Sequence, residues 1–238
     1  MSFISISLFL KKSKNCDKIQ NKQSGKRDFL DQFKNKVGNK EELRSIIGFP
    51  SELASKKVIL YIDSHCADFI AKSPFLMLAT ADEHGFCDVS PRGDMPGFVH
   101  VLNEKQFVIP ERPGNKRLDS LCNILSNPKI GLLFFIPGME ETLRINGKAA
   151  IIKDEELLEK MAVKGKKPLL GIGVEVEECF IHCAKALKRS SLWDTDSWPA
   201  KETLPSAAKI LFEHAKLPKS TVNTIQKGLE ESYTKRLY

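Results

Sequence analysis

The 238-residue chain lacks several features that would place it in a specialised class of protein. It has no apolar run near the roughly 20 residues that a membrane-spanning helix needs. None of its six cysteines forms a C-x-x-C pair, so nothing requires a disulfide framework, and we expect a reducing, cytoplasmic compartment. It also has no G-x-x-x-x-G-K-[ST] loop, no G-x-G-x-x-G turn and no nucleophile elbow, the motifs of the common nucleotide-binding and hydrolase folds.

The net charge of +7 is unevenly distributed along the chain. Residues 1–40 hold ten Lys/Arg and three Asp/Glu, whereas residues 41–238 hold 27 of each sign. The whole excess therefore belongs to an N-terminal tail, and the folded body does not need a basic surface. We expect no nucleic-acid partner, since a nucleic-acid-binding body would itself be basic.

The tail, residues 1–27, begins with the apolar stretch M-S-F-I-S-I-S-L-F-L, and its positive charge follows that stretch. A secretory signal has the opposite order. We expect a disordered extension. The alternative, weak attachment to an anionic membrane, is less favoured. It would use the basic residues Lys11, Lys12, Lys14 and Lys18, with Phe3, Ile4 and Leu8 inserted.

The rest of the chain changes from helical to strand-like patterns at about residue 74. Residues 28–73 carry apolar residues at helical spacing and form an N-terminal helical segment. Short apolar runs separated by turn residues then continue to about residue 181. One helix interrupts them before Pro128, with Leu118, Leu121, Cys122 and Leu125 on one face. Residues 196–238 form a C-terminal helical extension. The pattern predicts a mainly β fold with α additions, a small barrel with helices at both termini.

Two clusters of Pro, Gly, Arg and Asn stand out within 88–117. The first, S-P-R-G-D, offers a hydroxyl at Ser90 and a guanidinium at Arg92 for an anion, and Asp94 could hold Arg92 in place. Gly93 permits close approach of the backbone. Taken alone, this cluster is equally typical of a turn with a surface salt bridge.

The second cluster, I-P-E-R-P-G-N-K-R-L-D, joins a strand to the start of a helix. Free amides and the helix dipole favour an anion there. Arg112, Lys116 and Arg117 are cations beside that first turn, where they oppose the dipole unless an anion joins them. This mismatch favours a bound phosphate over an exposed loop.

Three further groups are weaker candidates. Thr142 and Arg144 alternate with apolar residues and share one face of a strand, either beside a ligand or toward solvent. A helix face would carry Lys185, Arg189 and Trp193. The third group, Cys179, His182 and Cys183, is a poor zinc pattern, and we expect these residues to be structural.

These motifs together resemble the pyridoxamine 5'-phosphate oxidase-like FMN-binding family, in its uncharacterised bacterial branch. The resemblance rests on A-T-A-D-E-H-G, D-V-S-P-R-G-D-x-P-G-F-V, I-P-E-R-P-G-N-K-R-L-D, G-L-L-F-F-I-P-G, E-T-L-R-I-N-G and H-C-A-K-A-L-x-R-S-x-L-W, over roughly residues 70–195. It implies a six-stranded FMN-binding split β-barrel over 74–195, and a homodimer with FMN at the interface.

The resemblance also implies site residues. One strand would line the flavin, the next strand end would adjoin it, and the helix start would bind its phosphate. The face of Thr142 would meet the cofactor, and Lys185 and Arg189 would reach the flavin of the partner subunit. The implied cofactor-binding residues are Val89, Ser90, Pro91, Arg92, Gly93, Ile109, Pro110, Asn115, Arg117, Thr142, Lys185 and Arg189.

Two departures separate the chain from true pyridoxamine-phosphate oxidases. Where those enzymes have an R-x-V-L-L-K-like strand, this chain has S-P-R-G-D-M, and their C-terminal arginine motif is not recognisable in E-E-S-Y-T-K-R-L-Y. We therefore expect an FMN-dependent oxidoreductase with another small-molecule substrate, taking a hydride from a nicotinamide cofactor or an organic donor. The alternative is a non-enzymatic flavin or haem carrier, since fold does not settle function. No side chain is a clear general acid or base.

Overall fold

The computed structural model describes residues 32–238 and divides the chain into two compact units, Met1–Ser51 and Glu52–Tyr238. The predicted tail, with its membrane-attachment alternative, and residues 28–31 of the predicted helical segment lie outside the described residues. In the first unit the described helix is α3 (Lys40–Ile47), which Asn39 caps and Gly48 ends with φ 82°. The predicted boundaries at 73/74 and 195/196 remain predictions.

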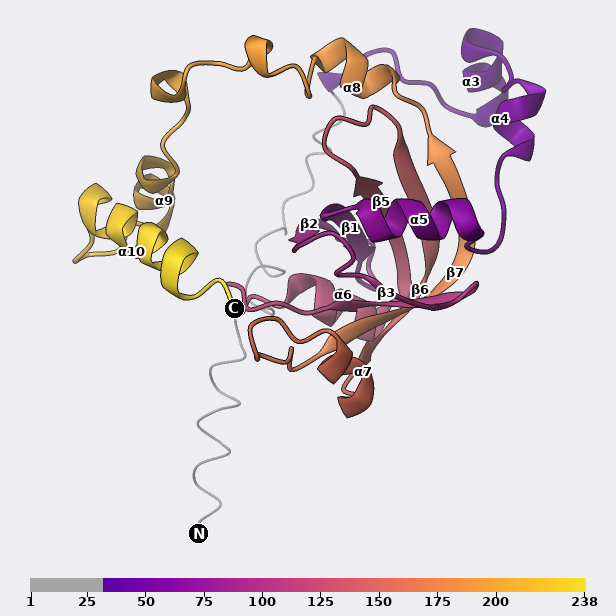
Figure 1. Cartoon of the computed structure of the whole chain (residues 1–238). Helices are drawn as coiled ribbons and strands as arrows, with labels where there is room; N and C mark the ends of the chain where they lie inside the picture. The colour runs from indigo at the N-terminus through magenta and orange to yellow at the C-terminus, as the bar shows by residue number, and fades with distance from the viewer. Residues whose placement is uncertain (1–31) are drawn as a thin grey trace. The chain divides into compact units, whose positions relative to one another are not determined.

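The second unit is built on one antiparallel sheet of seven strands, in the order β2-β1-β5-β6-β7-β4-β3. Figure 1 shows these strands curving around a shared interior. The strands are β1 (Phe75–Ala81), β2 (Cys87–Gly93), β3 (His100–Asn103), β4 (Gln106–Pro110), β5 (Lys129–Phe135), β6 (Thr142–Ile152) and β7 (Gly171–His182). The mainly β class with α additions is confirmed, and the expected six strands are seven.

The core is formed by inward-facing side chains that alternate along the strands. In β1, Leu76 and Leu78 face inward, and the register sets them opposite Phe134 and Leu132 of β5. All four are essentially inaccessible to solvent. Because side chains alternate with period two, this register keeps the apolar set inside.

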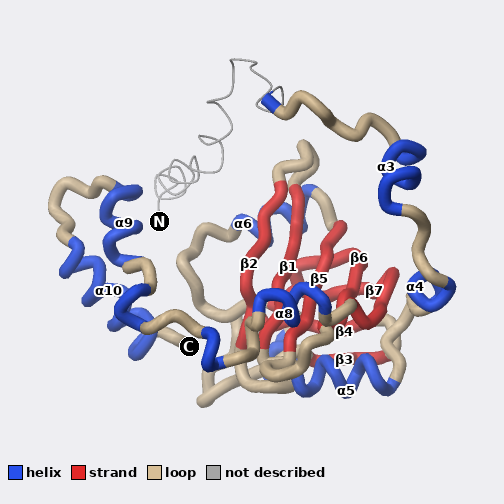
Figure 2. The backbone as a smooth tube through the Cα atoms, turned by 90° about the horizontal axis from the view of Figure 1, so that it is seen from above, coloured by secondary structure: helices blue, strands red, loops and turns tan. Residues whose placement is uncertain are grey.

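The α-helices of this unit are α4 (Glu52–Lys56), α5 (Ser64–Lys72), α6 (Asp119–Ser126), α7 (Glu155–Lys160), α8 (Lys185–Ser190), α9 (Ala207–Ala215) and α10 (Val222–Lys235). Of these, α5 and α6 pack against the sheet, whereas α9 and α10 pack mainly against each other. In Figure 2 the strands lie between α5 and α6. Both helices contribute to the core, through Phe69 and Ile70 from α5 and Ile124 from α6. No helix in the part of the chain that the structure describes is long and apolar enough to cross a membrane.

The face that α6 turns inward matches the predicted one only in part. Leu121 is buried as the stripe implied, but Leu125 is 77% exposed and Leu118 is 51% exposed, and the polar residues Ser120 and Asn123 are buried. The amide of Asn123 donates to Thr80 Oγ1 at 3.0 Å and to Asp88 Oδ2 at 2.8 Å. These hydrogen bonds satisfy the buried polar groups, so helical spacing identified the helix but only part of its buried face.

Strand β2 also extends further than its sequence suggests. It runs through Pro91 to Gly93 and pairs with β1 as far as Phe75↔Gly93. Proline is tolerated because β2 lies at the edge of the sheet, where its missing N–H costs no ladder hydrogen bond. The first Pro/Gly/Arg cluster is thus the end of an edge strand.

Candidate functional site

A cavity of about 680 Å³ opens where both clusters of the sequence meet. Its walls come from the end of β2, the segment 110–121 between β4 and α6, the segment 166–170 before β7, and Tyr238. Small-molecule sites typically enclose about 300–1,000 Å³, so the cavity has the size of a cofactor site.

The register of β4 with β7 explains why distant segments meet here. The antiparallel pairing sets Pro110 opposite Gly171. The residues that follow β4 therefore adjoin those that precede β7, and the amide of Glu111 donates to the carbonyl of Leu170 at 3.0 Å. Lysines 166 and 167 were missed in the sequence because this pairing decides their place.

The α6 end of the cavity has an unusual backbone. Lys116 and Leu118 both adopt left-handed conformations, with φ 61° and φ 63°. Such angles cost a non-glycine residue about 1–2 kcal/mol each and are concentrated at functional sites. Two of them in three residues indicate that the loop is held in a shape that local preference opposes.

The start of α6 also lacks a side-chain cap. Leu118 occupies the N-cap position and makes no capping hydrogen bond, whereas Asp63, Asp154 and Thr221 cap α5, α7 and α10. The amides of residues 119–121 have no acceptor among residues 32–238. Free amides at a helix start favour an anion.

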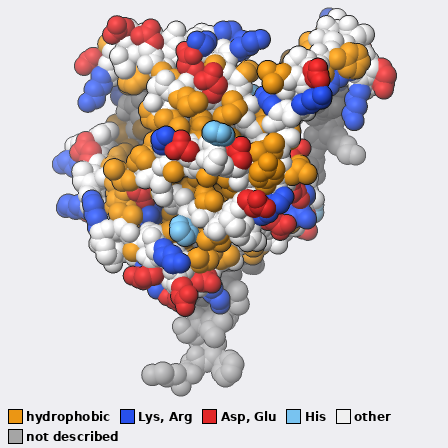
Figure 3. Space-filling view, turned by 45° about the vertical axis from the view of Figure 1, so that its right-hand side comes forward, with side chains coloured by type: hydrophobic (Ala, Val, Ile, Leu, Met, Phe, Trp, Pro, Cys, Tyr) orange, Lys and Arg blue, Asp and Glu red, His pale blue; other side chains and the backbone are white. Residues whose placement is uncertain are grey.

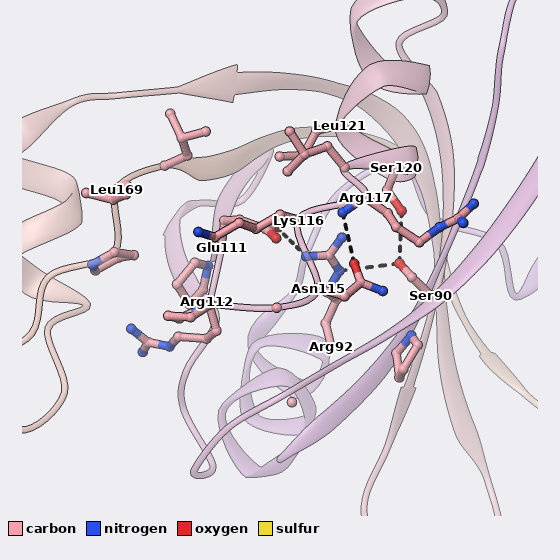
Figure 4. Close-up of a pocket in the computed structure, with 18 of the residues that line it drawn as sticks. Ser90, Arg92, Glu111, Arg112, Asn115, Lys116, Arg117, Ser120, Leu121 and Leu169 are labelled. Carbon is pink, nitrogen blue, oxygen red and sulfur yellow. Dashed lines mark hydrogen bonds and ion pairs between the residues drawn. The ribbon is translucent and has the colours of Figure 1, made fainter. Parts of the chain in front are cut away.

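Side chains converge on this end of the cavity, as Figure 4 shows. The hydroxyl of Ser90 lies 3.0 Å from that of Ser120 in the first turn of α6. Asn115 Oδ1 accepts from the amide of Arg117 at 3.0 Å, and the guanidinium of Arg117 binds Asp119 at 2.8 Å. Hydroxyl, amide and guanidinium groups therefore lie beside the uncapped helix start.

Two ion pairs connect the clusters, and their partners differ from the predicted ones. Arg92 binds Glu111, and Arg112 Nε binds Asp94 Oδ2 at 2.6 Å. Asp94 was expected to hold Arg92, and this expectation is wrong. The turn of the chain after Gly93 carries the Asp94 carboxylate to Arg112, and Glu111 takes its place beside Arg92. All four side chains are largely buried, at 1–22% exposure, so each charge needs the opposite charge that it has.

The cavity is basic overall. Six lining side chains are cations, namely Arg92, Arg112, Lys116, Arg117, Lys166 and Lys167, against the acids Asp88, Glu111 and Asp119. Among the described residues, Lys116 alone of the six has neither an ion pair nor a hydrogen bond. Elsewhere the face in Figure 3 mixes positive and negative side chains. The excess of cations is a property of this cavity.

The predicted cofactor-binding residues fall into two groups. Eight line the cavity: Val89, Ser90, Pro91, Arg92, Gly93, Pro110, Asn115 and Arg117. Ile109 and Thr142 are buried and do not line it. Lys185 and Arg189 are exposed on α8, also outside it. Cavity residues that the sequence did not single out include Ser120, Leu169 and Tyr238, and the sequence carries no signal for Tyr238.

The weaker groups are not brought together. Helix α8 ends at Ser190, so Trp193 does not continue its face as expected, and its indole instead donates to the carbonyl of Met139 at 2.8 Å. Cys179 is fully buried, whereas His182 and Cys183 are exposed. Within residues 32–238 no group of three His, Cys, Asp or Glu side chains is arranged to hold a metal ion.

Comparison with solved structures gives distant likenesses only. HupZ of Group A Streptococcus is 23% identical, over 50% of this chain and 93% of that one, with a TM-score of 0.42. An FMN-binding protein of Syntrophomonas wolfei is 9% identical over 49% and 88%, and HutZ, a haem storage protein of Vibrio cholerae, is 14% identical over 51% and 93%. Both have TM-scores of 0.38. No curated relative matches the chain.

A family model gives the assignment. The model described as pyridoxamine 5'-phosphate oxidase matches residues 62–183, just over half of the chain. The match spans α5 to the end of β7, with β2, the start of α6 and most of the cavity lining inside it. The chain therefore belongs to the pyridoxamine 5'-phosphate oxidase family.

Proposed function

We propose that the cavity binds FMN and that the protein is an FMN-dependent oxidoreductase acting on a small molecule other than pyridoxamine 5'-phosphate. The observation that carries the proposal is the uncapped start of α6, whose amides open into a basic cavity of cofactor size. Family membership supports the same cofactor.

The phosphate of FMN would bind at the start of α6. Ser90 and Ser120 supply hydroxyl donors, and Arg117 and Lys116 supply positive charge. Asn115 would act through the loop, because its side chain binds the main-chain amide of Arg117. A dianionic phosphate at this point would satisfy the free amides and compensate the left-handed residues of the loop.

The remaining cavity would hold the ring. FMN, when bound, supplies the hydride and electron chemistry, and the protein orients it. Pro91, Pro110 and Leu121 offer apolar surface, and Arg92 offers positive charge to an electron-rich edge. Glu111 fixes that guanidinium in place and tempers its charge. A small organic substrate or a nicotinamide donor would share this region.

Haem fits the described lining less well. The axial ligands of haem are usually His, Cys or Met, and none of the residues that line the cavity is of these types. Tyr238 is the one lining phenol, and its hydroxyl already binds Asp94. A flavin needs no such ligand, so the lining favours FMN.

We further propose that a second copy of the chain covers the cavity. Large apolar side chains stand exposed around its mouth, with Leu169 at 87%, Val89 at 59% and Leu118 at 51% exposure. Leu125 continues this apolar surface along α6. Exposed apolar groups at a cofactor site are typical of an interface. Lys185 and Arg189, which lie outside their own cavity, would then serve the cavity of the partner.

The decisive experiment compares FMN with riboflavin, which lacks the phosphate. Binding of each is followed by quenching of flavin fluorescence in the wild type, in Arg117→Ala and in Arg144→Ala, a control at an exposed arginine outside the cavity. A charged hydrogen bond contributes about 1.5–3 kcal/mol, so Arg117→Ala should weaken FMN binding roughly 10- to 100-fold. Riboflavin affinity should hardly change.

Two results would contradict the proposal. Equal losses for FMN and riboflavin would show that Arg117 does not contact the phosphate, and an unchanged FMN affinity in an Arg92/Arg117 double alanine variant would exclude this cavity. The absorbance of the purified protein identifies its natural cofactor. Bound FMN that no nicotinamide donor reduces would favour the carrier alternative.

A further inference from the structure

Tyr238 lines the cavity although it lies 68 positions along the chain beyond Leu170, the nearest other lining residue (238 − 170). Its hydroxyl donates to Asp94 Oδ1 at 2.7 Å, and its main-chain oxygen accepts from Lys166 Nζ at 2.8 Å. The ring lies near two cations, Arg112 Cζ at 5.8 Å and Lys164 Nζ at 5.3 Å from its centroid. Hydroxyl, ring and oxygen therefore each have a matched partner.

The partners of Tyr238 form a site that is built without it. The Asp94 side chain is 1% exposed, and it is held by Arg112 Nε at 2.6 Å and by the amide of Met95 at 2.8 Å. A buried carboxylate fixed in this way keeps its demand for one more donor if the tyrosine leaves. The three cations that surround the ring and oxygen likewise remain.

The chemistry of the site defines what else could occupy it. Asp94 requires a hydroxyl or N–H donor, the cations near the ring favour a planar aromatic group, and Lys166 favours an anionic oxygen. One small molecule that combines the three is an aromatic acid with a hydroxyl at the far end of its ring.

We propose that Tyr238 is a tethered occupant of a subsite for phenolic acids, at the end of the cavity away from α6, and that such a ligand binds by displacing it. The subsite consists of Asp94, Arg112, Lys164 and Lys166. It extends the proposed function by naming a substrate class, yet it does not require FMN to bind.

The tether sets the strength of the competition. A group attached to its own protein competes at an effective concentration of the order of millimolar for a short flexible link. A free ligand binds only the molecules from which the tyrosine is released, so its apparent affinity is its intrinsic affinity multiplied by the fraction of such molecules. Removing the side chain of Tyr238 should thus free Asp94 and the cations around the ring, and it leaves the four residues of the subsite in place.

The test uses 3-(4-hydroxyphenyl)propionate, which carries the phenol and an anionic oxygen at tyrosine-like spacing. Calorimetry measures its binding to the full chain as wild type, as Tyr238→Ala and as Tyr233→Ala, a control at an exposed tyrosine of α10 outside the cavity. We expect Tyr238→Ala to bind it at least about tenfold more tightly than the other two proteins do. Tyr238→Phe, which keeps the ring, should give an intermediate affinity.

Two related probes separate the contacts. Against Tyr238→Ala, 3-phenylpropionate lacks the hydroxyl and 4-ethylphenol lacks the carboxylate, and each should bind at least about tenfold more weakly than the full probe, because each loses one charge-assisted contact. Equal binding of all three probes, or no gain in Tyr238→Ala, would overturn the proposal. So would a gain in FMN affinity without probe binding, since Tyr238 would then occupy the space of the cofactor.

FMN content is measured in every sample. Probe binding to a Tyr238→Ala protein that also fails to bind added FMN would leave the subsite standing and refute the FMN proposal. FMN binding with the Arg117 dependence described above, but with no probe binding, would do the reverse.

Discussion

Asn123 is the residue whose loss should most clearly couple stability to the cavity. Its amide is buried on α6 and donates to Thr80 of β1 and to Asp88 of β2. It is thus a polar cross-link between α6 and the sheet. We predict that Asn123→Ala destabilises the fold and weakens FMN binding together, because both depend on the position of α6.

The magnitude follows from the two hydrogen bonds. The bond to the Asp88 carboxylate contributes about 1.5–3 kcal/mol, and the bond to the Thr80 hydroxyl contributes about 0.5–1.5 kcal/mol. Thr80 is 4% exposed, so water reaches the abandoned hydroxyl poorly. We expect a loss of about 2–4 kcal/mol in the free energy of unfolding.

Urea denaturation measures this loss. With a slope of about 2–3 kcal/mol per molar urea, the midpoint should fall by roughly 1 M without a change in slope. Asn223→Ala is the matched control, because Asn223 is an exposed asparagine of α10 outside the cavity, so its loss should shift the free energy by less than about 0.5 kcal/mol. A loss below about 0.5 kcal/mol in Asn123→Ala would refute the reasoning, as would destabilisation equal to that of the control.

Three further predictions concern the register shift at Gly147 in the pairing of β6 with β7, the carboxylate of Asp94, and assembly of the protein. A Cβ at Gly147 would lie 2.1 Å from the carbonyl oxygen of Glu175, so Gly147→Ala should lower the thermal unfolding midpoint far more than Gly114→Ala, where no atom lies within 4 Å. Burial works to raise the pKa of Asp94, but hydrogen bonds from Tyr238 and a main-chain amide, with the adjacent arginine, hold that pKa below its usual range. The stability difference between wild type and Asp94→Asn should therefore be full above about pH 4 and shrink as pH falls further; a difference that grew on acidification would contradict this. In light scattering, Leu125→Glu should convert a dimer into monomer, and a wild type that is already monomeric would remove the proposed partner.

Much of the fold could be predicted from the sequence because local rules govern it. Thr142 and Arg144 lie on a strand, β6, as their alternation with apolar residues indicated, and the helix expected before Pro128 is α6, which ends at Ser126. The Pro, Gly and Arg clusters drew attention to residues 90–94 and 109–119, most of which line the cavity. These signals are local, so a chain read in order reveals them.

Long-range pairing decided what the local patterns could not. The stripe of Leu118, Leu121, Cys122 and Leu125 indicated a helix, yet its burial depends on partners in β1 and β2 that only the folded chain supplies. The exchange of ion-pair partners, with Arg92 on Glu111 and Asp94 on Arg112, likewise depends on how two strand ends meet.

The sequence by itself determined the mainly β class, the family resemblance, and the two clusters that a phosphate would suit, because composition, periodicity and turn residues act over a few positions. Only the tertiary structure decided that the two clusters share one cavity, that Lys166 and Lys167 join them, and that Tyr238 closes one end. Those contacts join residues separated by up to 144 positions in the sequence. The contacts that form depend on the register of the sheet and on where the chain reverses, and no local pattern encodes either.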